Sequence, residues 1–372
     1  MATGEVIDTT VTAAASTRLG ARGRRREAWG QMVSSPSFWI GCGVLAAVLA
    51  GLVAVSVGVV AMAPWKVALE LLDHVPGVRV RSGLSATDAS IVWNIRFPRV
   101  VLALLVGAML SVSGGAYQAV FRNPLADPYL LGVAAGAGLG ATVVFSFGSS
   151  TASRGSFTLP IAAFVGALGA VVLAVGLAGG VKAGVATLVL SGVVIASFLT
   201  AVQTFLQQQH ADTLREVYGW ILGRLSTQGW HEVLVIVPYV VVTSVVLLAS
   251  ARTLDVLRVG DDEAASLGVP VRRVRLTVVA AASLGTAAAV AVSGLIGFVG
   301  IVVPHIVRMV AGHSYRIILP VSLLFGAAFL TLADVAARTV QAPAELPIGV
   351  VTAFVGAPFF LVVMRTSKSV MS

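Results

Sequence analysis

The amino-acid sequence predicts an all-α, polytopic membrane protein. Hydrophobic residues make up 57% of the 372 residues and charged residues only 11%, and the mean hydropathy is +0.95. Soluble domains carry roughly 25% charged residues, so this chain lacks the polar residues that would cover a water-exposed surface. The net charge of +9 does not indicate a nucleic-acid binder, because the basic residues lie in short gaps between apolar runs, where they set membrane topology. A soluble enzyme, a disordered chain and a nucleic-acid-binding protein are therefore disfavoured.

Apolar runs that are long enough to cross a bilayer recur along most of the chain. A helical crossing needs about 20 apolar residues, and about ten such runs can be separated. We expect transmembrane helices near residues 37–62, 98–121, 128–148, 157–180, 184–207, 232–251, 276–293, 295–311, 317–339 and 347–364. In the third run Gly132, Gly136 and Gly140 recur every four residues, a spacing that favours close packing of helices.

The stretch from Leu276 to Pro304 contains no charged residue. It is too long for one upright helix and too short for two helices with a full loop. Glycines and a proline interrupt it, and such breaks are tolerated at membrane depth where the backbone is covered by protein or lines a cavity. We therefore predict a short, broken eighth span beside a translocation pathway, and the candidate pathway residues in it are Gly297, Gly300 and Pro304.

Two glutamines near the outer end of the fifth run, Gln203 and Gln207, are further pathway candidates. Polar side chains at this depth either line a substrate path or face the outer interface of the membrane. The residues alone leave both interpretations open.

The N-terminal segment is polar and ends in a basic cluster. We expect residues 1–35 to be a disordered cytoplasmic tail, because the apolar run that follows is longer than the roughly 7–15 residues of a signal-peptide core. With the N-terminus inside, the larger share of the 25 lysines and arginines falls on the cytoplasmic side, as the positive-inside rule requires. Both termini are then cytoplasmic, and residues 36–372 form one transmembrane domain.

The loop between the sixth and seventh runs reads LDVLRVGDDEAASLGVPVRRVR over residues 254–275. Acids in a first turn suit a helix N-terminus, and glycine followed by proline suits a helix end. We predict a short cytoplasmic helix that comprises Asp261, Asp262, Glu263, Ala264, Ala265, Ser266, Leu267 and Gly268. So short a helix is marginal in water, so it either packs on its own spans or docks into a cytoplasmic partner, and the local sequence leaves both open.

Arginines mark the predicted outer ends of two spans. Arg96 and Arg99 flank the start of the second span, where they either snorkel to the interface or form a basic docking patch for an acidic partner. Near the outer end of the ninth span, Asp334 and Arg338 are four residues apart and can pair with each other along the helix.

Patterns typical of catalysis are missing from the sequence. No lysine stands in a Walker pattern, so any nucleotide hydrolysis is expected on another chain. His231-Glu232 opens an HExxH-like string that fails at Val235, and no G-x-S-x-G elbow occurs. The histidines are scattered and the chain has one cysteine, so we expect neither catalytic residues nor a metal site, which disfavours an intramembrane hydrolase. An ion-coupled secondary transporter would need intramembrane carboxylates, and Asp334 is the one acid placed well inside a span.

Several short motifs occur in one order along the chain: RFPR at 96–99, RNPLADP at 122–128, GLIGFVG at 294–300, PHI at 304–306 and ELPIG at 345–349. In this combination the sequence resembles the FecCD family, the permease subunits of type II ABC importers for iron–siderophore complexes, heme and vitamin B12. The resemblance covers about residues 38–365, nearly the whole chain, and leaves out the N-terminal tail.

The resemblance implies ten transmembrane helices per subunit, a homodimer with the pathway at its axis, and a location in the bacterial cell membrane. It implies two ATPase subunits, which bind ATP and Mg, and an extracytoplasmic substrate-binding protein, while this chain itself binds no cofactor. It places the family's coupling helix at Asp261–Gly268 and the arginines that meet the binding protein at Arg96, Arg99 and Arg338. An iron chelate is the favoured substrate, with heme or vitamin B12 as the alternative.

Overall fold

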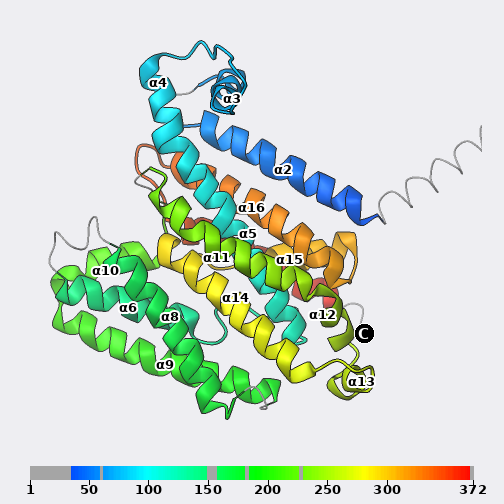
Figure 1. The fold of residues 1–372 in the computed structure, drawn as a ribbon. Helices are drawn as coiled ribbons and strands as arrows, with labels where there is room; N and C mark the ends of the chain where they lie inside the picture. The colour runs from blue at the N-terminus through cyan, green and yellow to red at the C-terminus, as the bar shows by residue number, and fades with distance from the viewer. Residues whose placement is uncertain (1–34, 59–61, 149–156, 181–183, 226–228, 369–372) are drawn as a thin grey trace, which may run out of the picture.

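The computed structural model describes residues 35–58, 62–148, 157–180, 184–225 and 229–368. Over these residues the chain is helical and contains no strand (Figure 1), as the sequence predicts. The predicted disorder of residues 1–35 falls on residues outside the described ranges, apart from Ser35.

Ten apolar helices form the body of the molecule: α2 (Pro36–Ser56), α5 (Phe97–Val120), α6 (Val133–Phe147), α8 (Thr158–Leu177), α9 (Val185–Gln209), α11 (His231–Ala249), α14 (Val271–Ser293), α15 (Val299–Ala311), α16 (Tyr315–Thr339) and α17 (Ile348–Lys368). Among the described residues, 7 helical stretches are long and apolar enough to cross a membrane. The others, α6, α15 and α17, are shorter apolar helices. Each predicted run thus corresponds to one helix, and the chain is a multi-pass membrane protein.

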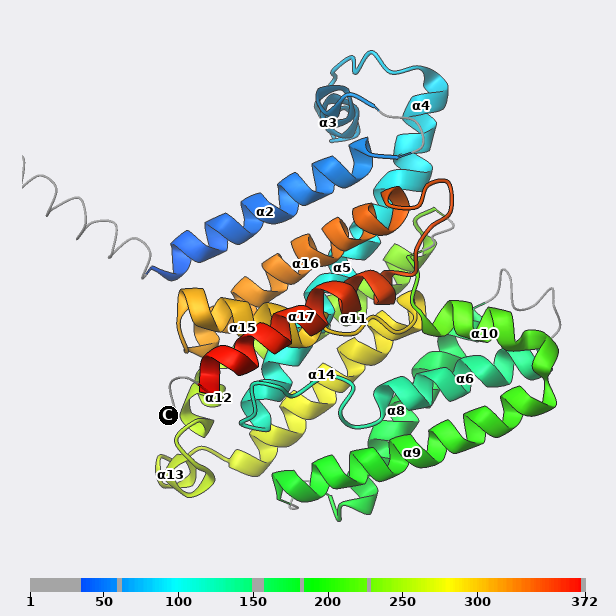
Figure 2. The same ribbon diagram turned by 180° about the vertical axis from the view of Figure 1, so that it is seen from behind.

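Short helices connect these elements: α3 (Pro64–Asp73), α4 (Ala86–Ile91), the π-helical turn η1 (Val92–Arg96), the 3-10 turn η2 (Ala211–Thr213), α10 (Leu214–Ile221), α12 (Ala251–Leu257) and α13 (Asp261–Ser266). Only α13 is predicted from the sequence. Helices α3 and α4 form a lobe at one end of the molecule, and α13 lies at the opposite end (Figures 1 and 2). We call these the α4 end and the α13 end.

The second span begins further upstream than predicted. The sequence places its start at residue 98, but α4 and η1 continue directly into α5, so that one helical stretch runs from Ala86 to Val120. Ser85 caps its start, because the serine hydroxyl accepts a hydrogen bond from the Asp88 amide at 3.1 Å. Pro98 lies in the first turn of α5, and the π-helical turn before it absorbs the irregularity that a proline introduces.

Helix α5 forms the core of the molecule. Every residue from Val106 to Val120 is buried, because α5 packs against α2, α11, α14, α15 and α16. Two glycines of α5 permit this close packing: a side chain at Gly107 would collide with the backbone of Gly326 on α16, and one at Gly114 with the backbone of Gly300 on α15. Small residues let membrane helices approach in this way.

Helices α6, α8 and α9 form a second group beside α14 (Figure 1). A side chain at Gly136 of α6 would collide with the Gly166 carbonyl of α8, and one at Gly140 with the Ala162 carbonyl. The packing interpretation of this glycine series is therefore confirmed for Gly136 and Gly140. Gly132 instead precedes α6 with a φ of 84°, a conformation that glycine adopts without strain.

Candidate functional site

Four charged side chains meet at the α4 end, where α5 approaches α16. Arg99 places Nη2 at 2.9 Å from Asp334 Oδ1, and it donates from Nη1 and Nη2 to the two Glu345 oxygens, both at 2.9 Å. Arg338 Nε lies 2.9 Å from Asp334 Oδ2, which confirms the predicted i,i+4 pair. Asp334 is 0% exposed and pairs with both arginines inside the protein, while Glu345 supplies the second negative charge. We call Arg99, Arg338, Asp334 and Glu345 the α4-end ion cluster.

Glu345 is the most open member of this cluster. Its side chain is 53% exposed, while it still accepts two hydrogen bonds from Arg99. These charge-assisted bonds hold the pKa of the Glu345 carboxyl below its ordinary value.

Arginines at the α4 end also bind the last carbonyls of α2. Arg338 donates to the carbonyls of Ala54 at 3.1 Å and Val57 at 3.2 Å, and Arg96 donates to those of Val55 at 3.1 Å and Ser56 at 3.4 Å. The final carbonyls of a helix have no partner within the helix and carry its negative dipole end, so the two guanidinium groups satisfy them and hold α2 to the bundle.

The structure therefore brings the three predicted docking arginines, Arg96, Arg99 and Arg338, to one end of the molecule. Each makes internal contacts there, and the Arg99 side chain is 18% exposed. A sequence pattern does not predict these contacts, because Arg96 and Arg338 bind backbone carbonyls of α2 and Arg99 binds carboxylates at least 235 residues away in the chain.

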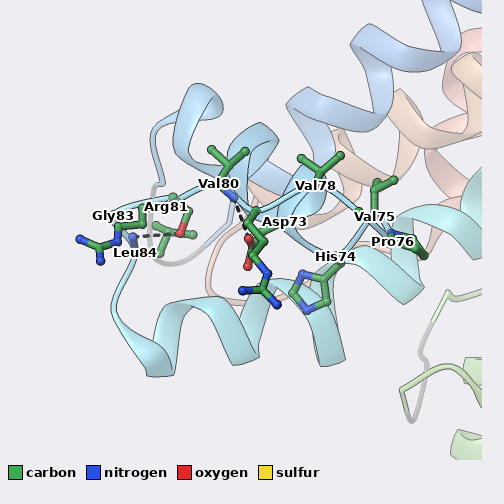
Figure 3. A pocket seen from close by; sticks show the side chains of 12 residues that line it. Asp73, His74, Val75, Pro76, Val78, Val80, Arg81, Gly83 and Leu84 are labelled. Atoms are coloured by element: carbon green, nitrogen blue, oxygen red, sulfur yellow. Dashed lines mark hydrogen bonds between the residues drawn. The ribbon is translucent and has the colours of Figure 1, made fainter.

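A nearby hollow of about 1120 Å³ lies within the loop that joins α3 to α4. Consecutive residues from Asp73 to Leu84 line it (Figure 3), and Asp73 Oδ1 accepts a hydrogen bond from the Val80 amide at 2.9 Å. No residue of the body helices contributes to its lining, so this hollow is a feature of the loop and is separate from the interior of the bundle.

The predicted break in the eighth span is present between α14 and α15. Residues 294–298 are not helical, and Gly294 and Phe298 both have a φ of 69°. Such a φ is ordinary for glycine but strained for phenylalanine. A side chain at Gly356 of α17 would collide with the Phe298 ring, so the glycine provides the space in which that ring rests against α17.

Two cavities flank this break. One, of about 440 Å³, is lined by Gln203 and Gln207 of α9, Tyr129, and residues of α6 and α10. The other, of about 680 Å³, is almost wholly apolar and is lined by Gly297, Phe298 and residues of α10 and α17. Ile221 and Leu295 line both, so the cavities adjoin.

The candidate pathway residues thus divide into two groups. Gln203, Gln207 and Gly297 line these cavities. Gly300 and Pro304 line neither: Gly300 packs against Pro128 and the Leu110 carbonyl of α5, and Pro304 is buried beside Gly115 of α5. Both residues lie at contacts between packed elements. The sequence does not distinguish such a position from a pathway lining, because both require small or kink-forming residues.

At the α13 end, the predicted short helix is present as α13, with Leu267 and Gly268 in the turn that follows it. Ala264 is fully buried, whereas the side chains of Asp262, Glu263 and Leu267 are exposed. The helix therefore buries one residue, Ala264, against the body and presents its other side outward.

Asp261, the first residue of α13, joins it to two other elements. Arg275 of α14 donates to Asp261 Oδ2 at 2.9 Å, and Arg122, just after α5, places Nη2 at 3.1 Å from Oδ1. The Asp261 and Arg122 side chains are 41% and 39% exposed. We call Asp261, Arg122 and Arg275 the α13-end ion cluster. Arg122 and Arg275 were not predicted as site residues, because neither is close enough to Asp261 in the sequence to form a local pattern with it.

Fold and site together define a class of protein: a multi-pass helical membrane protein with a broken span that lines two adjoining cavities, as membrane transporters have. The chain belongs to the FecCD transport family, whose family model matches residues 45–366. The family predicted from the sequence motifs is thereby confirmed.

Several curated relatives cover most of the chain. It is 44% identical to an uncharacterized ABC transporter permease protein, YvrB, of Bacillus subtilis, over 74% of this chain and 78% of the relative. It is 43% identical to the cobalamin import system permease protein BtuC of Halobacterium salinarum, over 81% and 79%. It is 41% identical to the hemin transport system permease protein HmuU of Yersinia pestis, over 73% and 82%.

A solved structure also matches. It is described as an inward-facing conformation of a metal-chelate type ABC transporter, and it superposes with a TM-score of 0.77 at 28% identity. The match covers 89% of this chain and 100% of the other.

Proposed function

We propose that this chain is the membrane-spanning permease subunit of an ATP-driven importer that takes up an iron chelate of the ferric siderophore class. The observation that carries the proposal is the family match over residues 45–366, together with relatives of similar length that are named as import permeases. The metal-chelate description of the matching structure and a 38% identical Fe(3+)-citrate import permease of Bacillus subtilis favour an iron chelate. Hemin and cobalamin are the competing substrates, because relatives at 41% and 43% identity carry those names.

The proposed subunit crosses the membrane ten times and works as a homodimer, with both termini in the cytoplasm and the α4 end outside. The positive-inside rule supports this orientation. Helix α17 supports the homodimer, because it lies on the face shown in Figure 2, leaves Phe354 76% exposed, and borders the apolar cavity of about 680 Å³. A second copy placed there would complete the pathway.

In the proposed cycle, a substrate-loaded binding protein docks at the α4 end, where Arg96, Arg99 and Arg338 are the candidate docking residues. Two separate ATPase subunits bind ATP and Mg and contact the exposed side of α13. Their closure moves α13, the spans rearrange around the two cavities, and substrate leaves toward the cytoplasm. Each partner shifts the equilibrium between outward and inward states only by its differential affinity for them. The permease carries out no bond chemistry.

The test is uptake into vesicles that contain this chain, its ATPase and, on the outside, its binding protein. Labelled ferric siderophore, hemin and cobalamin are compared, with an ATPase variant that cannot hydrolyse ATP as control. We expect ATP-dependent uptake of the ferric siderophore above the other two. Uptake of hemin or cobalamin instead would correct the substrate, and ATP-independent uptake by the chain alone would contradict the function.

That last outcome would favour an ion-coupled secondary transporter, the rival class. Such a transporter needs a carboxylate in the membrane that is able to bind an ion. Asp334 is a poor candidate, since Arg99 and Arg338 neutralise it.

A further inference from the structure

The segment between α5 and α6 touches both the α13-end ion cluster and the break before α15. It leaves the α13 end of α5 and runs to the start of α6 (Figure 2). Arg122 at its beginning pairs with Asp261 at 3.1 Å. Tyr129 near its end donates its hydroxyl hydrogen to the Ile296 carbonyl at 2.9 Å and accepts from the Ile296 amide at 3.1 Å. One short segment thus holds α13 at one end and the broken span at the other.

The segment is stiff. Asn123 Oδ1 accepts from the Leu125 amide at 2.9 Å, and Asp127 Oδ1 accepts from the Tyr129 amide at 2.8 Å. Side-chain turns of this kind fix the backbone locally, and the two prolines within RNPLADP fix φ at their own positions. A displacement at Arg122 is therefore passed to Tyr129 and is not absorbed between them.

Backbone strain marks both ends of this connection. Among the described residues, Arg122 with a φ of 48° and Phe298 with a φ of 69° are the two non-glycine residues with positive φ. Such conformations cost about 1–3 kcal/mol each and persist where the surrounding structure determines them. One lies at the contact with α13, and the other ends the break that Tyr129 holds and carries the ring packed at Gly356 of α17.

We propose that residues 121–132 are a rigid link that transmits movement of α13 to the break at residues 294–298, with Arg122 and Tyr129 as its two contact residues. The proposal rests on the proposed function for the origin of the movement, since the ATPases would displace α13. Beyond that function, it assigns the path by which the movement reaches the cavities: from Asp261 to Arg122, along the segment to Tyr129, and from Ile296 to Phe298 and α17.

Hydrogen–deuterium exchange on the purified full-length permease in lipid nanodiscs tests the link without ATPase or substrate. We expect Arg122→Gln to speed exchange of the amides at 294–299 and Tyr129→Phe to speed exchange at 261–268. Each variant then loosens the region that its own side chain does not touch, because coupling between two sites is reciprocal. Coupling energies between linked residues correspond to an acceleration of about two- to 150-fold.

Matched controls are Arg316→Gln, an exposed arginine at the start of α16, and Tyr239→Phe on α11. Neither should change exchange at 261–268 or 294–299. The link is contradicted if Arg122→Gln loosens only 121–132 and 261–268 while 294–299 keeps its wild-type rates. Should Arg122→Gln fail to fold, Arg122→Lys keeps the charge and should also speed exchange at 294–299, but by a smaller factor. Tyr129→Phe by itself tests the coupling from the break to 261–268.

The failure of the link and the failure of the proposed function are distinguishable. If wild-type vesicles with ATPase and binding protein take up none of labelled ferric siderophore, hemin and cobalamin, the function is wrong, and the exchange result still decides the link. If wild-type uptake is normal and Arg122→Gln and Tyr129→Phe transport as much substrate per ATP as wild type, the link is wrong and the function stands. We expect both variants to hydrolyse ATP while substrate uptake per ATP falls severalfold.

Discussion

The two ends of the molecule use the same chemistry in different surroundings. At the α4 end, Arg99 and Arg338 share Asp334, which is 0% exposed. At the α13 end, Arg122 and Arg275 share Asp261, which is 41% exposed. In each cluster one carboxylate joins two arginines from elements far apart in the chain.

Burial determines what each cluster is able to do. Removing one partner from a buried ion pair leaves an uncompensated charge and costs about 3–5 kcal/mol, whereas an exposed pair contributes about 0–1 kcal/mol. The α4-end ion cluster is therefore a permanent brace between α5 and α16. In the α13-end ion cluster Arg275 is 7% exposed, whereas Asp261 and Arg122 are 41% and 39% exposed, so the contact between Asp261 and Arg122 lies near the surface, where a partner that displaces α13 would act on it.

The largest effect is expected from Asp334→Ala. It leaves Arg338 without a carboxylate partner and Arg99 with Glu345 alone, so unfolding free energy should fall by about 3–5 kcal/mol. Thermal unfolding in detergent measures this, with the exposed Asp212→Ala as control, where a change within about 0.5 kcal/mol is expected. A loss below about 1 kcal/mol at Asp334 would show that the cluster is not a brace.

Arg122→Gln should have a much smaller effect on stability. The Arg122 side chain is 39% exposed, and Asp261 keeps Arg275 as its partner in the variant, so a loss of no more than about 1 kcal/mol is expected. The same thermal unfolding assay checks it. A loss equal to that of Asp334→Ala would remove the contrast between the two ends.

Glu345→Gln should change docking more than stability. The change leaves Arg99 paired with Asp334 and makes the α4-end ion cluster more positive by one charge, which speeds association with an acidic binding protein. Surface binding kinetics should show a faster association rate that returns toward wild type as salt is raised. Glu216→Gln, an exposed acid on α10, serves as control; an unchanged rate for Glu345→Gln would separate Arg99 from the docking surface.

The smallest effect is a pH dependence of the Glu345 contact. Arg99 lowers the folded-state pKa of Glu345 from its ordinary 4.5. The contribution of this contact to the free energy of unfolding is therefore fully present above pH 4.5, and it is lost as the pH falls through the lowered pKa. The stability difference between wild type and Glu345→Gln should be constant from about pH 7 to pH 5 and should vanish well below pH 4.5. A difference that already declines near pH 6 would contradict the lowered pKa.

Hydropathy alone locates the body helices, because apolar runs of span length in a chain with so little charge are typical of membrane helices. The acids in the first turn of α13 and the glycines on either side of it also form a local sequence pattern, so this helix is predicted as well. Helices α3, α10 and α12 are missed, because each is too short to produce a run that stands out from a loop.

The candidate site was predicted less completely. Asp334 and Arg338 lie on one helix, so their spacing reveals the pair. The contacts of Arg96 with α2 and of Tyr129 with Ile296 involve backbone groups, which carry no residue-specific signal. Separating Gln203, which lines a cavity, from Gly300, which packs against α5, requires the arrangement of helices in space.

The buried aspartate of α16 also bears on how the chain enters the membrane. A carboxylate carried into lipid on its own helix is costly to insert, and Arg99, which neutralises it, lies 235 residues earlier in the chain. Synthesis therefore delivers the cation to the bilayer long before the acid emerges from the ribosome. The order of translation supplies Asp334 with a waiting counter-ion, and α16 is best inserted against α5 rather than alone.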